Sequence, residues 1–255
     1  MPTERFDFVG SNGQRLAGRL DLPESPPRAA ALFAHCFTCG KDIYAANRLA
    51  GALTSRGIGV LRFDFTGLGS SEGEFGNGGL TSNIEDLKAA AAAMRERDLA
   101  PQLLIGHSLG GAAVLAVAGG IPEVRAIATI AAPYDAAHVL NLFKQQLLAI
   151  ESEGAAQVHL SGRPFTISRE FVADVRRYSG AEHISGLRKA LLIMHSPTDA
   201  VVGIENAALI FQHAHHPKSF VSLDDSDHLL RRASDADYVA AVIAAWVARY
   251  LERAR

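Results

Sequence analysis

Apolar residues gather along the chain in eight short runs, and segments of helical period separate these runs. The later runs are almost continuously apolar, which is typical of parallel strands covered on both faces. The first two runs alternate between apolar and polar residues, which favours an antiparallel edge of the same sheet. The predicted strands are Phe6–Val9, Leu16–Leu20, Ala29–His35, Ile58–Asp64, Gln102–Gly106, Arg125–Ala131, Ala190–His195 and Ser219–Leu223.

The segments between the strands carry apolar residues on one stripe at three- and four-residue spacing. Helices are predicted over Tyr44–Arg56, over Leu80–Asp98 and over the final segment from Val239 to Tyr250. Ser82 and Glu85 have the spacing of a capping box, which places the start of the second helix. Strands that alternate with helices predict an α/β fold, a doubly wound and mostly parallel sheet with right-handed crossovers and helices on both faces.

One segment, at about residues 135–187, breaks this alternation. Its expected elements are a helix over Val139–Ile150, a hairpin of Gln157–Leu160 and Pro164–Ile167 around a Ser161-Gly162 turn, and a helix capped by Ser168 that runs to about Tyr178. An insertion of this length after a core strand is most simply a cap or lid. We therefore expect a single domain over residues 1–255 that carries a cap insertion at about 135–187.

The composition is that of an ordinary globular protein, with 255 residues, 48% of them hydrophobic, and a net charge of −2. These values exclude an intrinsically disordered protein. The sequence has no block of Lys and Arg residues that would bind the phosphates of a nucleic acid. The longest uncharged apolar run, Val239 to Ala248, is far short of the roughly 18 residues of a membrane span. No apolar stretch opens the N-terminus as a signal peptide would. We expect a cytoplasmic protein with no membrane and no nucleic-acid partner.

The sharpest chemical signal is Gly106-His107-Ser108-Leu109-Gly110, which lies between a predicted buried strand and the helix-period run Ala112–Ala118. A G-x-S-x-G motif in this position is typical of a nucleophile elbow, a tight turn that lifts the Ser108 hydroxyl clear of the sheet. The backbone N–H of Leu109, at a helix N-terminus, would then point to where an oxyanion develops. The alternative is a Gly-rich turn without chemistry.

A nucleophilic serine needs a base, and the base needs an acid that orients it. The elbow predicts the chain order Ser, acid, His. Asp199 and His228 follow two successive predicted strands, so both are expected at the carboxyl edge of the sheet, where such a sheet binds its ligand. The alternatives are a turn aspartate and an exposed loop histidine. Asp135, after the preceding strand, is the rival acid.

A second oxyanion donor is expected from the loop after the strand Ala29–His35. The backbone N–H of Phe37 is the candidate, and those of Cys36 and Thr38 come next. A backbone donor leaves no signature in the side chains, so position alone supports this choice.

Two further motifs give the chain a family resemblance. His35-Cys36-Phe37-Thr38 stands where a His-Gly-Phe-type oxyanion segment is found, and Asp64–Ser71 resembles the Asp-x-x-Gly-x-Gly-x-Ser loop after strand four. With the elbow, the late Asp and the late His, the whole chain resembles the α/β-hydrolase fold serine esterases. The inserted segment is similar to the cap of feruloyl- or cinnamoyl-esterase-like members. The N-terminal segments resemble hydrolase domains fused to osmotically induced peroxidase-like domains.

Cys36 departs from that family pattern, because it stands where a Gly is usual and its side chain narrows the freedom of the backbone. It also forms Cys36-x-x-Cys39 between a strand and a helix, a spacing that permits a redox dithiol. We favour the alternative of two small thiols that fill space in the loop. A metal site of His35 and the two cysteines is weaker still, since no further paired ligands are near.

No cofactor and no metal are expected. The Gly67-Leu68-Gly69 turn follows a strand, but a dinucleotide fingerprint would need a third Gly where Glu72 stands. A Gly-rich turn that lines the entrance of the site is the simpler interpretation.

The pattern as a whole predicts a serine esterase that cleaves small carboxylic esters through an acyl-enzyme. Amide or thioester hydrolysis and acyl transfer use the same machinery, and the fold does not choose among them. Two other classes stay open, a thiol-redox protein that uses Cys36 and Cys39 and a catalytically silent binding protein of the same fold. The near-zero net charge favours a small neutral substrate. The oligomeric state stays open as well, a homodimer included.

Overall fold

An eight-stranded sheet forms the centre of the protein, whose computed structural model describes residues 2–160, 162–178 and 180–251. In spatial order its strands are β1 (Thr3–Arg5), β4 (Gly18–Asp21), β6 (Ile58–Phe63), β5 (Ala29–Ala34), β7 (Leu103–His107), β8 (Ala126–Ile130), β11 (Ala190–His195) and β12 (Lys218–Ser222). β4 pairs antiparallel with β1 and β6, and the other pairs are parallel. The predicted mostly parallel sheet with an antiparallel N-terminal edge is confirmed.

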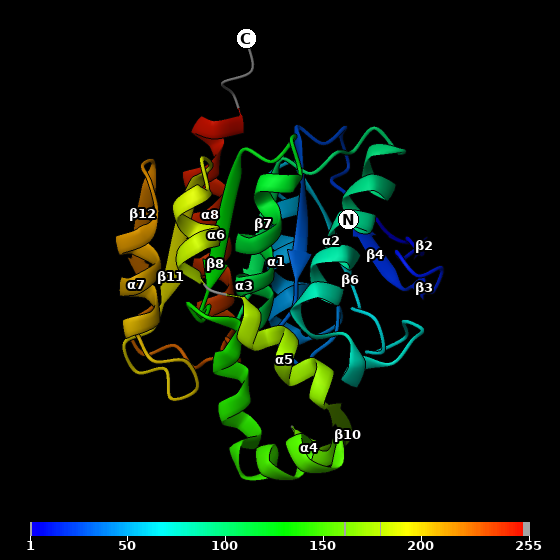
Figure 1. Ribbon diagram of the computed structural model, residues 1–255. Helices are drawn as coiled ribbons and strands as arrows, with labels where there is room; N and C mark the ends of the chain where they lie inside the picture. Colours follow the sequence, from blue (N-terminus) through cyan, green and yellow to red (C-terminus); the bar gives the residue numbers. More distant parts are fainter. Residues whose placement is uncertain (1, 161, 179, 252–255) are drawn as a thin grey trace.

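Alternate residues of the central strands face two separate apolar cores. In β5, for example, Leu32 packs into one core and Phe33 into the other. The helices α1 (Tyr44–Thr54) and α8 (Ala233–Leu251) cover the core that contains Phe33. The helices over the opposite core are α2 (Gly79–Arg95), α3 (Leu109–Val117), α6 (Gly180–Gly186) and α7 (Glu205–His213). Because both faces of the sheet are covered (Figure 1), the central strands carry apolar residues at most positions.

Between β8 and β11 the chain leaves the sheet and returns only after six further elements. These are η3 (Ala136–Gln146), α4 (Leu147–Glu153), β9 (Ala155–Leu160), β10 (Arg163–Ser168), α5 (Arg169–Arg177) and α6. β9 and β10 form the predicted antiparallel hairpin, while Ser161 of its predicted turn lies outside the described residues. Figure 1 shows η3, α4, β10 and α5 below the sheet, at the opposite end of the molecule from the end of α8.

The helix predicted over Val139–Ile150 is wrong in detail. The chain forms the 3-10 helix η3 first and the α-helix α4 after it, and Phe143 interrupts the helical backbone with φ −140° and ψ 34°. The cap predicted for the following helix is confirmed, because the Ser168 hydroxyl accepts a hydrogen bond from the Phe171 N–H at 3.2 Å.

The predicted capping box at Ser82 and Glu85 is also wrong. α2 begins three residues earlier, at Gly79, so Ser82 lies inside the helix. The first turn of the helix is capped by a residue from a distant segment instead. The Asp174 carboxylate of α5 accepts a hydrogen bond from the Thr81 N–H at 2.8 Å.

At the N-terminus, the predicted strand Phe6–Val9 is shorter than expected, because only β2 (Phe8–Val9) forms, and it pairs with β3 (Arg15–Leu16) in a small ladder of its own. The strand that joins the edge of the central sheet is β1, which precedes the predicted run and was not predicted. In the part of the chain that the structure describes, no helix is both long and apolar enough to cross a bilayer.

Candidate active site

Ser108 stands in the sharp turn that joins β7 to α3. Its backbone has φ 54° and ψ −124°, a conformation that residues other than glycine rarely adopt. The neighbouring glycines let α3 approach the sheet, because a Cβ on Gly110 would lie 2.3 Å from the Ala34 carbonyl oxygen. The Ser108 N–H donates to the Ile130 carbonyl of β8 at 2.9 Å. The turn therefore has the strained backbone of a nucleophile elbow and is held in place by the strands around it.

Ser108, His228 and Asp199 form a hydrogen-bonded row at the carboxyl edge of the sheet. His228 Nε2 lies 3.0 Å from Ser108 Oγ, and His228 Nδ1 lies 2.8 Å from Asp199 Oδ2. A carboxylate can only accept, so Nδ1 carries the proton and donates to Asp199. Nε2 is then left to accept a hydrogen bond from the Ser108 hydroxyl. This orientation is the one in which an imidazole can take the proton of a serine.

Asp199 is fixed in the loop after β11 by the backbone around it. Its Oδ1 accepts hydrogen bonds from the N–H groups of Val201 at 2.8 Å and Val202 at 3.0 Å. Burial alone would raise the pKa of Asp199, but the hydrogen bonds from His228 and from these two amides outweigh it and hold the pKa below its ordinary value. Asp199 is therefore a carboxylate at neutral pH, as the partner of a histidine N–H must be.

Asp135, the rival acid, is engaged elsewhere. Its Oδ1 accepts a hydrogen bond from the Gly180 N–H at 2.7 Å, which ties the start of η3 to the start of α6. The structure thus brings Asp199 to His228 and gives Asp135 a different partner.

Two buried histidines hold the backbone of the loops that carry His228 and Asp199. The Nε2–H of His107 donates to the His228 carbonyl at 2.6 Å, and the Nε2–H of His195 donates to the Val202 carbonyl at 2.7 Å. Burial lowers the pKa of His107 to about 4 and also lowers that of His195, so both rings are neutral. Sequence reasoning missed both, although a histidine at the end of an apolar strand is a visible signal for such a role.

The loop after β5 and Ser108 line one cavity of about 390 Å³. The residues that line it are Cys36, Phe37, Cys39, Ser108, Leu142, Thr198, Ala200, Val201, Asp227, His228, Leu229 and Arg231. Among the described residues, the N–H groups of Phe37 and Leu109 have no hydrogen-bond acceptor. A free N–H is expected at the first residue of a helix, which is where Leu109 lies. Both predicted oxyanion donors are therefore unengaged.

Cys36 and Cys39 are joined by a disulfide. The expectation of two separate thiols that fill the loop is wrong. The weaker alternative of a metal site fails with it, because the sulfur ligands are paired with each other and the described residues hold no cluster of three or more His, Cys, Asp or Glu side chains suited to a metal ion.

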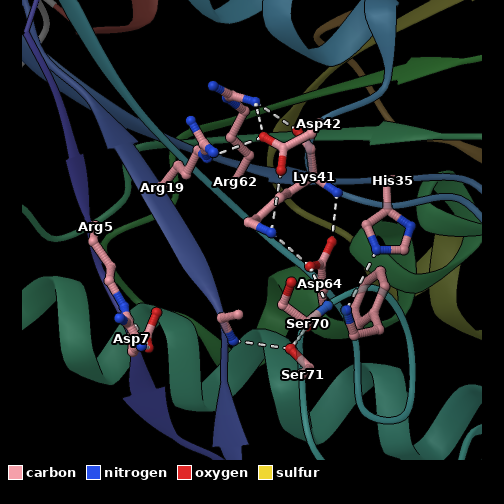
Figure 2. Close-up of polar contacts among 12 residues, drawn as sticks. Arg5, Asp7, Arg19, His35, Lys41, Asp42, Arg62, Asp64, Ser70 and Ser71 are labelled. Carbon is pink, nitrogen blue, oxygen red and sulfur yellow. Dashed lines mark hydrogen bonds and ion pairs between the residues drawn. The ribbon is translucent and has the colours of Figure 1, made fainter.

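A buried ion pair holds the loop after β5 against the Gly-rich turn after β6 (Figure 2). Asp64 accepts hydrogen bonds from the Lys41 N–H and from Lys41 Nζ, each at 2.7 Å, and from the Ser70 N–H at 2.9 Å. Burial would raise the pKa of Asp64, but these bonds hold it below its ordinary value. A Cβ on Gly69, whose φ is +54°, would lie 2.3 Å from the Asp64 carboxyl carbon. The motif keeps glycine there so that the turn can wrap around the aspartate.

His35 adds a second tie between the same two segments. Its Nδ1–H donates to the Cys36 carbonyl at 2.8 Å, and its Nε2 accepts a hydrogen bond from the Phe65 N–H at 3.3 Å. Burial lowers the pKa of His35, so the ring is neutral and serves both bonds.

The hairpin β9–β10 also contacts the loop after β5. Arg163 donates to the Thr38 carbonyl oxygen, and its guanidinium lies 5.4 Å from the ring centroid of Phe165. The Phe37 ring packs with its centroid 5.1 Å from that of Phe75 and 5.8 Å from that of Phe171. Phe165 and Phe171 of the inserted segment also contact the Phe75 ring, so they belong to one aromatic cluster with Phe37.

Known proteins resemble this chain over most of its length. The model of a family described as serine aminopeptidase, S33, matches residues 25–186. The uncharacterized protein YfhR of Escherichia coli O157:H7 is 26% identical over 234 residues, which cover 89% of this chain and 73% of YfhR. The crystal structure of an esterase domain from a Rhodothermus marinus protein is 50% identical, with a TM-score of 0.82, over 98% of this chain and all of that one.

A second solved structure shows the shared fold alone. Est1E from Butyrivibrio proteoclasticus, in a structure with ferulic acid bound, superimposes with a TM-score of 0.82 at 18% identity. The match covers 96% of this chain and 99% of Est1E.

Proposed function

Because the chain belongs to the serine aminopeptidase S33 family and has the fold of the α/β-hydrolases, we propose that it is a serine esterase that hydrolyses small carboxylic esters. One observation carries the proposal. Asp199 accepts a hydrogen bond from His228, and His228 in turn accepts a hydrogen bond from the Ser108 hydroxyl. The strained backbone of Ser108 supports it, since such conformations persist where function needs them.

The reaction proceeds through an acyl-enzyme. Ser108 Oγ attacks the ester carbonyl carbon while His228 Nε2 takes its proton, and Asp199 holds the imidazole and stabilises the imidazolium. The N–H groups of Leu109 and Phe37 donate to the oxyanion of the tetrahedral intermediate. His228 then gives its proton to the leaving alkoxide. Water, deprotonated by His228, attacks the acyl carbon, and the carboxylic acid leaves as Ser108 regains its proton.

Two observations favour an ester over a peptide substrate. The Rhodothermus marinus relative at 50% identity is named an esterase domain. An aminopeptidase would need a free carboxylate to bind the ammonium group of its substrate. Asp227 is the one carboxylate among the described residues that line the cavity, and Arg231 Nε, which lies 3.5 Å from it, also lines the cavity, so the lining offers an ammonium group no net negative charge.

Residues 135–187 act as the cap of a single domain. Leu142 of η3, whose surface is 49% exposed, lines the cavity together with Ser108. Its contact with a bound acyl or alcohol group would bury apolar surface that is otherwise exposed to water.

The experiment compares p-nitrophenyl esters of increasing acyl length with amino-acid p-nitroanilides on the purified protein. We expect the short esters to be hydrolysed with a kcat/KM at least about 100-fold above that of any anilide. If kcat/KM for the anilides equals or exceeds that for the esters, the protein is a peptidase and the proposed esterase function is wrong. A thiol-redox function would leave both substrate series untouched and show instead as disulfide reduction.

A further inference from the structure

The disulfide of Cys36 and Cys39 encloses the backbone of the oxyanion loop. The two cysteines are three positions apart, so the covalent ring contains only Phe37 and Thr38 between them. Phe37 carries the N–H that the proposed mechanism assigns to the oxyanion. Both cysteines line the cavity that also contains Ser108 and His228.

The enclosed turn holds a backbone conformation that its sequence disfavours. The Cys39 N–H donates to the Cys36 carbonyl at 3.1 Å, which makes residues 36–39 a tight turn. Thr38, the third residue of that turn, has φ +61°. A β-branched residue is an outlier in the left-handed region, where Gly or Asn is usual. A constraint other than the preference of Thr38 must hold the turn in this form.

A ring this small acts on local geometry more than on global stability. In the chain-entropy account, a cross-link stabilises a fold by restricting the unfolded chain, and the gain shrinks with the length of the loop that it closes. A disulfide across two intervening residues restricts little of the unfolded chain. What it does restrict is the pair of peptide planes next to the Phe37 N–H.

We propose that the Cys36–Cys39 disulfide positions the oxyanion donor of Phe37, so that the redox state of this pair sets the turnover of the enzyme. This inference rests on the proposed esterase function. When the bond is reduced, Thr38 can relax toward negative φ, and the peptide planes of the turn reorient. The donor then leaves the position of the developing oxyanion. Stabilisation of the transition state falls while substrate binding in the rest of the cavity is retained.

Reduction consumes one small dithiol. Cys39 is the accessible partner, because it is partly exposed whereas Cys36 is buried. A thiolate of the reductant attacks Cys39 Sγ and forms a mixed disulfide, and Cys36 leaves as the thiolate and takes up a proton. The second thiol of the reductant then attacks its own sulfur in the mixed disulfide, which releases Cys39 as a thiol. Two electrons pass to the protein pair, and the dithiol becomes a cyclic disulfide.

The test measures hydrolysis of p-nitrophenyl butyrate before and after incubation of the native protein with dithiothreitol, with thiols counted by a colorimetric reagent. The chain has 2 Cys, so every thiol that appears belongs to this pair. We expect two thiols per chain, a fall in kcat of about 10- to 100-fold, little change in KM and recovery on reoxidation. An arylboronic acid, which mimics the tetrahedral intermediate, should lose affinity by about the same factor.

The double variant Cys36→Ser/Cys39→Ser is the matched control. Its kcat should equal that of the reduced wild-type protein without any reductant, and dithiothreitol should not change it. Its melting temperature should lie within about 3 °C of that of the wild-type protein. The inference is overturned if the variant keeps the wild-type kcat, if reduced protein with two counted thiols keeps its kcat, or if activity is lost only through unfolding. If dithiothreitol does not reduce the disulfide of the native protein, the kcat of the double variant tests the inference.

Ser108→Ala is assayed alongside to separate this inference from the proposed function. If Ser108→Ala hydrolyses the ester as fast as wild-type protein, the esterase mechanism itself fails. If hydrolysis depends on Ser108 but its rate is the same with the cysteine pair oxidised or reduced, only the positioning role of the disulfide is overturned.

Discussion

His107 Nε2 lies 2.6 Å from the backbone carbonyl oxygen of His228. The residue directly before the proposed nucleophile thus holds the backbone of the proposed base. Because the carbonyl can only accept, the ring must donate from Nε2, and the strand end that presents Ser108 also fixes the loop that presents His228. The two partners of the proton transfer are placed by one short contact.

We predict that His107→Phe lowers kcat by about tenfold and leaves KM nearly unchanged. The variant removes the N–H donor, so the His228 loop loses the contact that fixes the distance from Nε2 to Ser108 Oγ. His107→Gln keeps an N–H donor on a side chain of similar reach and should recover most of the rate. Equal rates for all three proteins in steady-state assays would exclude a positioning role for His107.

The stability of the protein should fall in mild acid because of its buried neutral histidines. Burial lowers the pKa of His107 from 6.5 to about 4. Between these values the unfolded chain binds a proton that the folded protein does not, so the free energy of unfolding decreases as pH falls from 6.5 to 4. For His107 the loss amounts to roughly 3 kcal/mol. His35 and His195 act in the same direction.

Urea unfolding at a series of pH values measures this effect. His107→Phe should show a shallower decrease across the same window, since the variant has no ring to protonate at that position. Burial raises the pKa of Asp86 to about 6, so that carboxyl acts in the opposite direction in this window, and the test is the difference between the two proteins. Equal slopes for wild-type protein and His107→Phe would contradict the burial of a neutral His107.

The choice of acid is tested by a matched pair of substitutions. Asp199→Asn should lower kcat by about 10³- to 10⁴-fold, because an amide no longer holds His228 in the tautomer that accepts from Ser108. Asp135→Asn should keep kcat within about twofold, since Asp135 bonds to the Gly180 N–H instead. If the larger loss fell on Asp135, the proposed row would be wrong.

The buried pair of Lys41 and Asp64 should matter for stability. Lys41→Met leaves the Asp64 carboxylate without its counter-ion, and we expect the free energy of unfolding to drop by about 3 kcal/mol. Arg176→Met breaks the exposed pair with Glu151 and should cost less than about 1 kcal/mol. Denaturant melts of the two variants compare these values, and equal losses would show that the buried pair has no special weight.

Sequence pattern predicted the sheet because most strands are buried on both faces and therefore carry a strong apolar signal. It also predicted which chain segments reach the carboxyl edge of the sheet, and the structure places Ser108 and Asp199 there, each within hydrogen-bond distance of His228. The order of the elements is enough for such a prediction, because parallel strands present their carboxyl ends on the same side.

Features that depend on contacts between distant segments could not be predicted. The start of α2 was missed because its acceptor, Asp174, is 93 residues from Thr81. The break at Phe143 leaves no Pro or Gly signature in the sequence. The pairing of Cys36 with Cys39 depends on the turn between them, and spacing alone permits either two thiols or a disulfide.

The most direct measurement is covalent labelling of the purified protein with a fluorophosphonate probe, followed by mass spectrometry of the labelled peptide. We expect one adduct per chain on Ser108, no labelling of the folded Ser108→Ala variant, and ester hydrolysis that stops as the adduct forms. Folded wild-type protein that stays unlabelled, or Ser108→Ala that labels equally well, would contradict the proposed mechanism.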